Sequence, residues 1–425
     1  MLVGAEVQTL LYTKKVFLTR MKRFTLENFP LENKTVFLRV DYNVPLEKEK
    51  VVDDNKIRSS LPTIRYLLQK NCKIVLATHL GNPAGKVDAK LKVNPLFSRL
   101  QELLSKEKKW NIIQFIKLND CIGKEIKAKI AESKPKTIFM LENLRFYREE
   151  ETNDVFFAHS LAQLAEVYVN DAFAVSHRKH ASVDAITKYL PSLPGLLLET
   201  EIQQLSLALN PKKPAIWIMG GAKLNKIDLI KQALKKADYL LIGGALAFSF
   251  LRAKGINMGL SKLDPESVKI AAKILKSEAA KKIILPVDFV AAADFSPHAQ
   301  TEIVKYNHLQ DQQTALDLGP ETVSLFKQYL RKAHTIVWNG PLGYFEWAKF
   351  AHSTKEIGRF LGKLTATAIC GGGETVEAVR KFRLEHYFTH VSTGGGAALM
   401  FLSGQELPGI TALENNYQKF KRKFR

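Results

Sequence analysis

One unit recurs along this chain: an apolar run typical of a β-strand, a polar or glycine-rich break, and then a stretch with helical periodicity. In the first half the apolar runs are Val36–Leu38, Ile74–Ala77, Thr137–Leu141 and Val167–Val169. In the second half they are Ala215–Met219, Tyr239–Ile242, Ile283–Leu285, Thr335–Trp338, Ala366–Cys370 and His390–Ser392. Strands and helices that alternate in this way predict parallel sheets covered by helices on both faces. The expected fold class is therefore α/β, with two doubly wound, Rossmann-like parallel-sheet domains joined by a hinge helix.

The length of the chain favours two domains, because 425 residues are too many for one compact core. A proline-rich segment at 191–195 indicates the boundary, and residues 196–210 after it carry apolar side chains at a helical period. We expect an N-terminal domain over 21–195, an interdomain helix over 196–210 and a C-terminal domain over 211–400. Residues 1–20 carry little pattern and are expected to be either a disordered extension or the product of a misplaced start codon. Residues 401–425 are expected to form a tail that returns to the N-terminal domain.

Composition restricts the choice of partners. The formal net charge of +21 favours anionic partners, whether phosphorylated metabolites, nucleotides, nucleic acid or acidic lipid. Because the excess is spread along the chain, except for a dense block at 419–425, solvated surface lysines explain it better than nucleic-acid binding does. No apolar run approaches the length of a membrane span. The three cysteines form no CxxC pair and no metal-ligand spacing, which favours a reducing cytoplasm. We therefore expect a cytoplasmic monomer without a membrane or nucleic-acid partner.

Polar side chains follow the strands of the first half. The run 35–46 shows this most clearly, because its apolar residues end in Arg39, Asp41 and Asn43 before a proline. Parallel strands bring such residues together at the carboxyl edge of a sheet, where α/β enzymes bind ligands. Other polar residues at predicted strand ends are His79, Arg145, His177 and Arg178. Guanidinium groups bind phosphate and carboxylate oxygens in a bidentate way, so together these residues predict an anion pocket. Any one of them alone is better explained as a structural ion-pair partner.

Glycine clusters follow the strands of the second half instead, at 220–221, 243–244 and 371–373. Glycine lets the backbone approach phosphates closely, and helix N-termini favour negative charge. The sequence has no GxxxxGK[ST] motif and no HRD or DFG motif, so a nucleotide site here is of another kind. A small anionic substrate on the first domain and a nucleotide on the second are the expected division.

Taken in order, these segments resemble the phosphoglycerate kinase family from Met21 to about Ile410. The run 35–46 is close to the opening motif of that family. Further matching runs are HRKHAS at 177–182, LPVD at 285–288, LDLGPET at 316–322, WNGPLGYFE at 338–346 and STGGGA at 392–397. The resemblance implies two lobes that close about a hinge, with 3-phosphoglycerate on the first and Mg²⁺ with ATP or ADP on the second. It implies reversible phosphoryl transfer between 1,3-bisphosphoglycerate and ADP.

The resemblance also assigns residues. The implied catalytic residues are Lys56, Lys223, Gly373 and Gly396. The implied substrate-binding residues are Arg39, Asp41, Tyr42, Asn43, Lys56, His79, Leu80, Gly81, Asn82, Arg145, His177 and Arg178. The implied nucleotide-binding residues are Gly221, Ala222, Lys223, Lys226, Gly243, Gly244, Gly319, Pro320, Asn339, Glu346, Gly372, Gly373, Glu374 and Thr375. Glu374 is the implied Mg²⁺ ligand.

Four positions near the expected chemistry depart from the family pattern. Lys56 stands where the family has an arginine, and Asn82 replaces the arginine of the HLGRP motif. Glu374 replaces the aspartate of GGGDT. The segment after GGAK is one residue short before its second lysine, which leaves the role of Lys226 open. The first hypothesis is an active kinase with altered kinetics. Its rivals are a family member that binds ligands without catalysis, as an interaction protein, and a nucleic-acid-binding protein.

Overall fold

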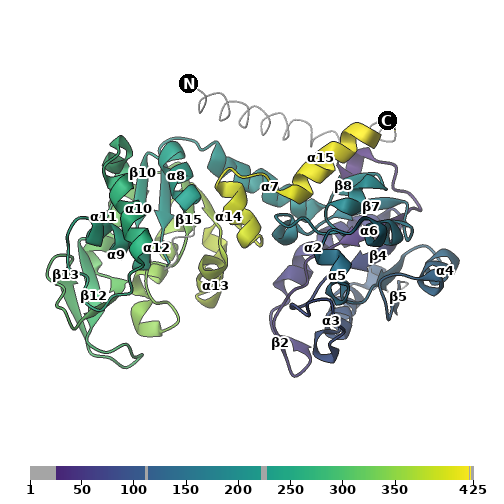
Figure 1. The fold of residues 1–425 in the computed structure, drawn as a ribbon, viewed down its shortest axis with the longest axis horizontal. Coiled ribbons are helices and arrows are strands. Elements are labelled where there is room, and N and C mark those ends of the chain that lie inside the picture. Colours follow the sequence, from purple (N-terminus) through teal and green to yellow (C-terminus); the bar gives the residue numbers. More distant parts are fainter. Residues whose placement is uncertain (1–24, 111–112, 222–226, 421, 423–425) are drawn as a thin grey trace. The chain divides into compact units, whose positions relative to one another are not determined.

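The structure, a computed structural model, describes residues 25–110, 113–221, 227–420 and 422. The chain divides into two compact units, of which the first holds residues up to Gln203 and from Glu406 onward, and the second holds Gln204–Gln405. Helix α7 (Leu196–Leu209) continues through this division (Figure 1). The expected extension at 1–20 lies outside the described residues.

The first unit is built on a parallel sheet of six strands in the order β5-β6-β4-β1-β7-β8. Its strands are β1 (Thr35–Arg39), β4 (Lys73–Ala77), β5 (Gln114–Lys117), β6 (Thr137–Met140), β7 (Val167–Asn170) and β8 (Ser192–Pro194). Its α-helices are α2 (Asn55–Gln69), α3 (Asn94–Ser105), α4 (Lys124–Glu132), α5 (Arg148–Glu151), α6 (Val155–Ala162) and α15 (Pro408–Phe420). Its short 3₁₀ helices are η1 (Leu26–Asn28), η2 (Ala89–Leu91), η3 (Lys108–Trp110), η4 (Leu144–Phe146), η5 (Phe173–Val175) and η6 (Ala185–Lys188). Strands β2 (Leu46–Glu47) and β3 (Lys50–Val51) form a separate antiparallel hairpin.

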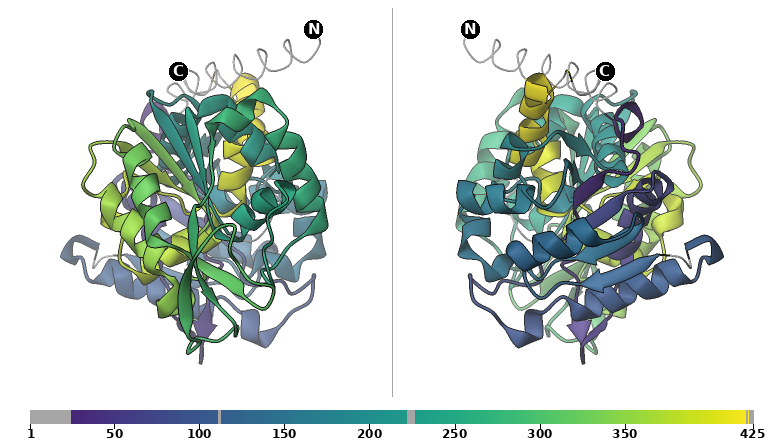
Figure 2. Two further views of the ribbon diagram at one scale, coloured as in Figure 1. Left: turned by 90° about the vertical axis from the view of Figure 1, so that its left-hand side faces the viewer. Right: turned by 90° about the vertical axis from the view of Figure 1, so that its right-hand side faces the viewer.

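The second unit contains a parallel sheet of six strands in the order β11-β10-β9-β15-β16-β17. These strands are β9 (Ala215–Met219), β10 (Tyr239–Ile242), β11 (Ile283–Ile284), β15 (Thr335–Asn339), β16 (Thr367–Cys370) and β17 (His390–Val391). A second, antiparallel sheet has the order β13-β12-β14, with β12 (Asp288–Ala292), β13 (Thr301–Lys305) and β14 (Thr314–Leu318). The helices are α8 (Ile227–Lys236), α9 (Gly244–Ala253), α10 (Pro265–Leu275), α11 (Pro320–Leu330), α12 (His352–Leu361), α13 (Gly373–Lys381) and α14 (Gly396–Leu402), with η7 (Glu278–Lys282), η8 (Ala348–Phe350) and η9 (Glu385–Tyr387). The left view of Figure 2 shows helices flanking the strands of this unit.

Both large sheets have the burial pattern of doubly wound folds. Every residue of β6, β7, β9 and β15 is buried, as expected for parallel strands covered by helices on both faces. The longer helices contribute apolar stripes, as in α2, where Ile57, Leu61, Ile64 and Leu68 are buried. The predicted fold class is confirmed, and each predicted apolar run forms a strand. The sequence pattern did not predict β5, β8, the β2–β3 hairpin or the antiparallel sheet of the second unit.

The last described helix, α15, packs against β8 and η6 of the first unit. Asn416 fixes it there, because its side chain accepts a hydrogen bond of 2.8 Å from Ser192 N. The same side chain donates to the carbonyls of Leu190, at 2.7 Å, and Thr187. The first unit is therefore assembled from two distant segments of the chain. No helix among the described residues is long and apolar enough to cross a membrane.

Candidate active site

The sheet order of the first unit brings its polar strand ends together. Strands β6, β4, β1 and β7 are neighbours, so the loops that follow them emerge side by side. These loops carry Arg145, His79, Asp41 and the segment 171–180. The side chains themselves lie close together: His79 Nδ1 is 3.4 Å from Arg39 Nη2 and 3.9 Å from Asp41 Oδ1.

Arg39, the last residue of β1, is buried in a network of hydrogen bonds. Its Nε donates to Ser182 Oγ over 2.7 Å, and its guanidinium also donates to the carbonyl of Val40. Glu150 lies behind it, fully buried, with Oε1 3.7 Å from Arg39 Nη2. Glu150 is fixed in turn by Ser182, whose Oγ and N donate to it over 2.6 and 2.9 Å. Since a buried charge needs a partner, Glu150 stabilises the ionised arginine at this position.

Asp41 and Lys56 form a second polar pair. Lys56 Nζ, on α2, donates to Asp41 Oδ2 over 2.8 Å and to the carbonyl of Asn43 over 3.1 Å. Burial would raise the pKa of Asp41, but the attraction of His79 in its protonated form, the attraction of Lys56 and the hydrogen bonds from Lys56 and Asn43 N outweigh it. The result is a pKa lowered to about 2. Asp41 is therefore ionised at neutral pH and holds the lysine in place.

The histidines of this edge are uncharged at neutral pH. Burial, with Arg39 and Arg145 nearby, lowers the pKa of His79 well below its ordinary value, although Asp41 opposes the shift. Burial and the charges of Arg39, Arg145 and Arg178 lower the pKa of His180 to about 3. Burial and the charge of Arg178 also lower the pKa of His177. Several cations therefore face this edge at once, and an anion bound there would relieve their mutual repulsion.

The loop after β4 also contributes to this edge of the sheet. Arg145 Nη1 donates to the carbonyl of Gly81 over 2.8 Å, and its Nε lies 3.3 Å from Glu151. Asn43 Oδ1 accepts a hydrogen bond of 2.9 Å from Gly81 N. Gly81 has φ of 63°, a conformation that glycine adopts without strain. Arg145 and Asn43 are thus held by the same turn.

The remaining predicted substrate residues differ in exposure. Arg178 and Asn82 are exposed and free to meet a ligand, and His177 is half-buried with Nδ1 lacking a hydrogen-bond partner. Tyr42 is fully buried and its hydroxyl lies 2.6 Å from Ser60 Oγ, so its side chain belongs to the core. Leu80 is also buried, and its backbone N and O pair with Asn143. Tyr42 and Leu80 therefore contribute to the shape of the loops. Arg39, His79 and Arg145 are also buried, whereas Arg178 is exposed at the edge.

In the second unit, glycines allow the strand ends to touch. A Cβ on Gly220 would lie 2.1 Å from the carbonyl oxygen of Pro341, and one on Gly340 would lie 2.1 Å from that of Gly220. The backbone segments after β9 and β15 are therefore in direct contact. Asn339 is buried below them, where its Nδ2 donates to the carbonyl of Gly371 over 2.6 Å. Gly340 N donates to Thr375 Oγ1 over 2.6 Å, so Asn339 and Thr375 support the loops from beneath.

A cavity of about 650 Å³ opens beside these loops. Of the predicted nucleotide-binding residues, Gly221, Gly244, Glu346 and Glu374 line it. Its other walls are largely apolar and come from β12, β14 and the loops around them. This lining includes Leu260, Phe289, Phe295, Leu316 and Tyr344, with Lys262 as a cation. An apolar cavity bordered by glycine-rich loops has the form of a site for a flat, phosphate-bearing ligand.

The predicted residues Gly319 and Pro320 begin α11, which Asp288 caps. The buried Asp288 carboxylate accepts hydrogen bonds from Glu321 N, Thr322 N and Thr322 Oγ1 at 3.0, 2.7 and 2.6 Å. A Cβ on Gly319 would lie 2.3 Å from this carboxylate. Neither Gly319 nor Pro320 is among the cavity-lining residues, and neither are Gly243, Gly372, Gly373 and Thr375. Ala222, Lys223 and Lys226 lie outside the described residues.

Comparison with known proteins identifies this arrangement. A family model described as phosphoglycerate kinase matches residues 26–405. The chain belongs to the phosphoglycerate kinase family. The phosphoglycerate kinase of Moorella thermoacetica is 45% identical over 397 residues, which cover 92% of this chain and 99% of that protein. The chloroplastic phosphoglycerate kinase 1 of Arabidopsis thaliana is 42% identical over 398 residues, 92% of this chain and 81% of that protein. A solved phosphoglycerate kinase structure from Coxiella burnetii superimposes with a TM-score of 0.83 at 33% identity, covering 93% of this chain and all of that one.

Family membership confirms the expectation of a phosphotransferase. The comparisons give no support to the rival, an interaction protein without catalysis. The structure shows where three of the four departures from the phosphoglycerate kinase pattern lie. Lys56 is bonded to Asp41, whereas Asn82 is exposed, and Glu374 is exposed on the cavity wall in the first turn of α13.

Sequence reasoning missed three groups of residues. Glu150 was passed over because a run of acidic residues is typical of a solvated helix face. The apolar wall of the cavity was missed because its strands, β12 and β14, were not predicted. Alternation of buried and exposed positions in 288–292 and 314–318 is weak, with nearly every residue buried, so only the composition of these segments could have indicated them. Lys262 stands in a loop, where no periodicity marks it.

Proposed function

We propose that this kinase transfers a phosphoryl group reversibly between 1,3-bisphosphoglycerate and ADP, with 3-phosphoglycerate bound by the first unit and the nucleotide by the second. The observation that carries the proposal is the cluster of cationic side chains at the carboxyl edge of the first sheet. Arg39 and Arg145 lower the pKa of His79, and the same two arginines with Arg178 lower that of His180. Glu150 and Glu151 pair with Arg39 and Arg145, whereas Arg178 is exposed and has no ion pair among the described residues, so it can meet an anion directly. A triose phosphate with a carboxylate supplies the two negative groups that such an edge can bind.

In this proposal the first unit positions a nucleophile that needs no base. The attacking atom is a carboxylate oxygen of 3-phosphoglycerate or, in reverse, a phosphate oxygen of ADP, and both are ionised at neutral pH. Catalysis then consists of orientation and of neutralising charge on the moving phosphoryl group. Arg39 and Arg145, fixed by Glu150 and Gly81, orient the substrate with little loss of side-chain freedom. Lys56 supplies a single positive charge toward the transferring group.

We infer that Mg²⁺ accompanies the nucleotide and that Glu374 holds it. Mg²⁺ in phosphate-transfer sites takes one or two carboxylates together with substrate phosphates and water, and it neutralises phosphate charge when bound. Among the described residues, no group of three or more His, Cys, Asp and Glu side chains could hold a metal. Glu374, exposed on the cavity wall, fits a metal that arrives with the nucleotide. Asp317 also lines the cavity, but it is buried and accepts hydrogen bonds from Leu318 N and Ser353.

The proposal extends to the behaviour of the whole molecule. Substrate and nucleotide are assigned to separate units, so turnover includes closure about α7, and small-angle scattering should show compaction only when both ligands are present. We further propose a cytoplasmic monomer. Three free cysteines, all buried, support a reducing compartment. Sedimentation at micromolar concentration measures the mass, and a dimer would contradict this part of the proposal.

A coupled assay tests the function directly. Oxidation of NADH by an added dehydrogenase, driven by 3-phosphoglycerate and ATP, should require Mg²⁺ and the intact protein. Arg178→Ala and Arg145→Ala should each raise the KM for 3-phosphoglycerate at least tenfold, because each removes a charged ligand. Arg359→Ala, an exposed arginine of the second unit, removes the same charge and should change that KM less than twofold. Equal effects of the three substitutions would show that the cluster acts only through its net charge. Absence of turnover above that of a Lys223→Ala, Arg178→Ala double variant would contradict the function.

Glu374 gives a separate test of the metal assignment. Its side chain is one methylene longer than the aspartate of the family motif, whereas Mg²⁺ demands near-octahedral geometry at roughly 2.0–2.1 Å. Mn²⁺ tolerates distorted geometry better, so the Mn²⁺/Mg²⁺ activity ratio should be higher in this protein than in its Glu374→Asp variant. The same ratio in both proteins would mean that Glu374 does not hold the metal.

A further inference from the structure

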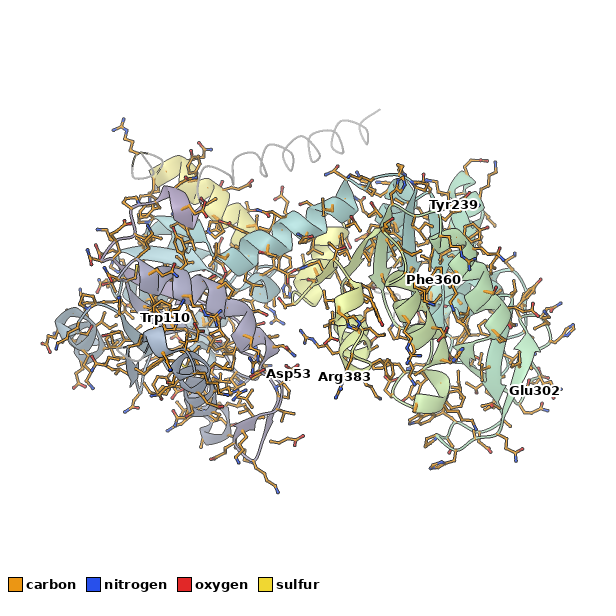
Figure 3. All side chains as sticks on the ribbon, turned by 180° about the vertical axis from the view of Figure 1, so that it is seen from behind. Asp53, Trp110, Tyr239, Glu302, Phe360 and Arg383 are labelled. Carbon is orange, nitrogen blue, oxygen red and sulfur yellow. The ribbon has the colours of Figure 1, made fainter. Side chains whose placement is uncertain are left out.

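The first unit contains a second hollow, of about 1100 Å³, outside the proposed substrate site. It is lined by residues of the β2–β3 hairpin, of η2 and its flanks, and of α3. Strand β3 and α3 contact each other, in the region labelled β2 and α3 in Figure 1. None of the predicted substrate-binding residues lines it. Figure 3 labels Asp53, which follows the hairpin and marks the start of α2 beside this region.

The hollow is lined by several basic residues, and its lysines have no ion-pair partners in the described part of the chain. Lys48, Lys50, Lys90 and Lys92 line it and are exposed, and none has an ion pair within the described part of the chain. A fifth cation, Arg99, is already bound to Asp54 and Glu102. Against the four free lysines stand only two lining acids, Glu49 and Glu102, and Glu102 is neutralised by Arg99 and Lys106. The free charge of the hollow is therefore positive.

The geometry of the hairpin holds two of these lysines in place. Lys48 and Glu49 both have positive φ, 47° and 60°, which is the conformation of the tight turn that suits two-residue hairpins. Glycine or asparagine is the usual choice at such positions, because other residues pay a steric cost. The turn pairs Glu47 with Lys50 and Leu46 with Val51 in a fixed register. The turn and the register thus set the backbone positions of Lys48 and Lys50.

The uncharged part of the hollow restricts the class of ligand. It is aliphatic, with Leu46, Val51 and Pro95, and no aromatic side chain lines it. Single-stranded nucleic acid binds through aromatic platforms on which bases stack, and these are missing among the lining residues. Lysines act as point charges toward carboxylates and phosphates alike, so the aliphatic lining is what restricts the ligand further. Carboxylates flanked by aliphatic side chains match both features.

We propose that this hollow docks an extended acidic segment of a partner protein, whose carboxylates pair with the four lysines and whose aliphatic side chains cover Leu46, Val51 and Pro95. The volume is several times that of a single small anion and accommodates a short stretch of peptide. The surface is independent of the phosphoryl-transfer chemistry, so docking leaves the active-site residues free.

Fluorescence anisotropy with a labelled twelve-residue peptide of alternating Glu and Leu tests the proposal. The probe should bind the full chain at 50 mM salt and more weakly at 150 mM, as screening requires. A variant with Lys48→Ser, Lys50→Ser, Lys90→Ser and Lys92→Ser should bind at least tenfold more weakly. The matched control removes four exposed lysines at α4 of the same unit, through Lys124→Ser, Lys127→Ser, Lys129→Ser and Lys134→Ser, and should change binding less than twofold. Kinase activity in both variants reports correct folding.

Three results would overturn the proposal. Equal loss of binding in the two variants would mean that the probe senses only the net charge of the protein. Equal binding of a peptide with Gln in place of Glu would exclude recognition of carboxylates. Tighter binding of a twelve-nucleotide oligouridine than of the acidic peptide at 150 mM salt would assign the hollow to RNA.

Discussion

Substitution of Glu150 measures how much one buried carboxylate contributes to the free energy of unfolding of this enzyme. Its partner Arg39 is 1% exposed and Glu150 itself 0% exposed, so solvent screens neither charge. The substitution Glu150→Ala leaves the guanidinium of Arg39 without its counter-charge and Ser182 N without its acceptor. Breaking a buried ion pair from one side typically costs about 3–5 kcal/mol. We expect a loss of unfolding free energy of that size.

The assay is calorimetric unfolding. A loss of 1 kcal/mol lowers Tm by about 2–4 °C in domains of this size, so the expected fall is about 6–20 °C. Hydrogen exchange of peptides from β1 should report that the loss lies in the first unit. Glu150→Gln, which keeps an acceptor for Ser182 but removes the charge, separates the hydrogen bond from the ion pair. The KM for 3-phosphoglycerate should rise in both variants, because Arg39 loses its support.

Glu149→Ala is the matched control, since Glu149 is the exposed neighbour on the same helical turn. Surface substitutions of this kind usually change stability by no more than about 0.5 kcal/mol. If Glu150→Ala lowers Tm no further than Glu149→Ala does, Arg39 does not depend on Glu150 for its charge and the network described here has no energetic weight.

Three further predictions concern single groups. Lys56→Arg should raise kcat, because an arginine fork adds bidentate contacts to the transferring group that one ammonium lacks. Asn82→Arg should chiefly lower the KM for 3-phosphoglycerate. Changes of kcat and KM under about twofold, or ~0.5 kcal/mol, in steady-state kinetics would show that neighbouring cations already compensate. Burial raises the pKa of Asp171 to about 7 against the hydrogen bonds from Thr63, Leu197 N and Leu198 N. The stability that protonated Asp171 contributes to the folded state is complete below pH 3.8, its ordinary pKa, and is lost as the pH rises through about 7. The Tm of the wild type should therefore fall relative to that of Asp171→Asn between pH 4 and pH 8. Parallel curves of Tm against pH would contradict this. The three cysteines are buried with raised pKa values, so an aromatic disulfide reagent should label them only as fast as the protein unfolds, and rapid labelling of the native enzyme would refute their inertness.

The sequence was most informative where local pattern and tertiary role coincide. Runs such as Ala215–Met219 and Tyr239–Ile242 became β9 and β10 with the same bounds, because strands covered on both faces are continuously apolar. The short edge strand β8 was read as a domain boundary, since Ser192–Pro194 contains proline and too few residues to show a pattern. An edge position tolerates proline because one side of the strand needs no donor.

The sequence predicted which residues belong to the candidate site, but not the hydrogen bonds between them or their protonation. Strand-end chemistry and family motifs together named Arg39, Asp41 and His79, and the sheet order brings their loops together. Their protonation depends on burial and on charges from other loops, which no linear pattern records. The LPVD and LDLGPET motifs were recognised separately, yet only the structure shows that Asp288 of the first caps the helix that begins in the second. The roles of the site residues stay predictions until they are measured.

The return of α15 to the first unit sets an order for biosynthesis. Residues 204–405 form the second unit without interruption, so a ribosome delivers all of it before the segment 408–420 has emerged. The first unit, although synthesised earlier, still lacks the helix that covers β8 and the Asn416 side chain that satisfies Ser192 N and two carbonyls. Domains generally complete themselves in the order in which they leave the ribosome. Here the unit that starts first is sealed last, and a released chain truncated after residue 405 should expose β8 to proteases while the second unit is resistant.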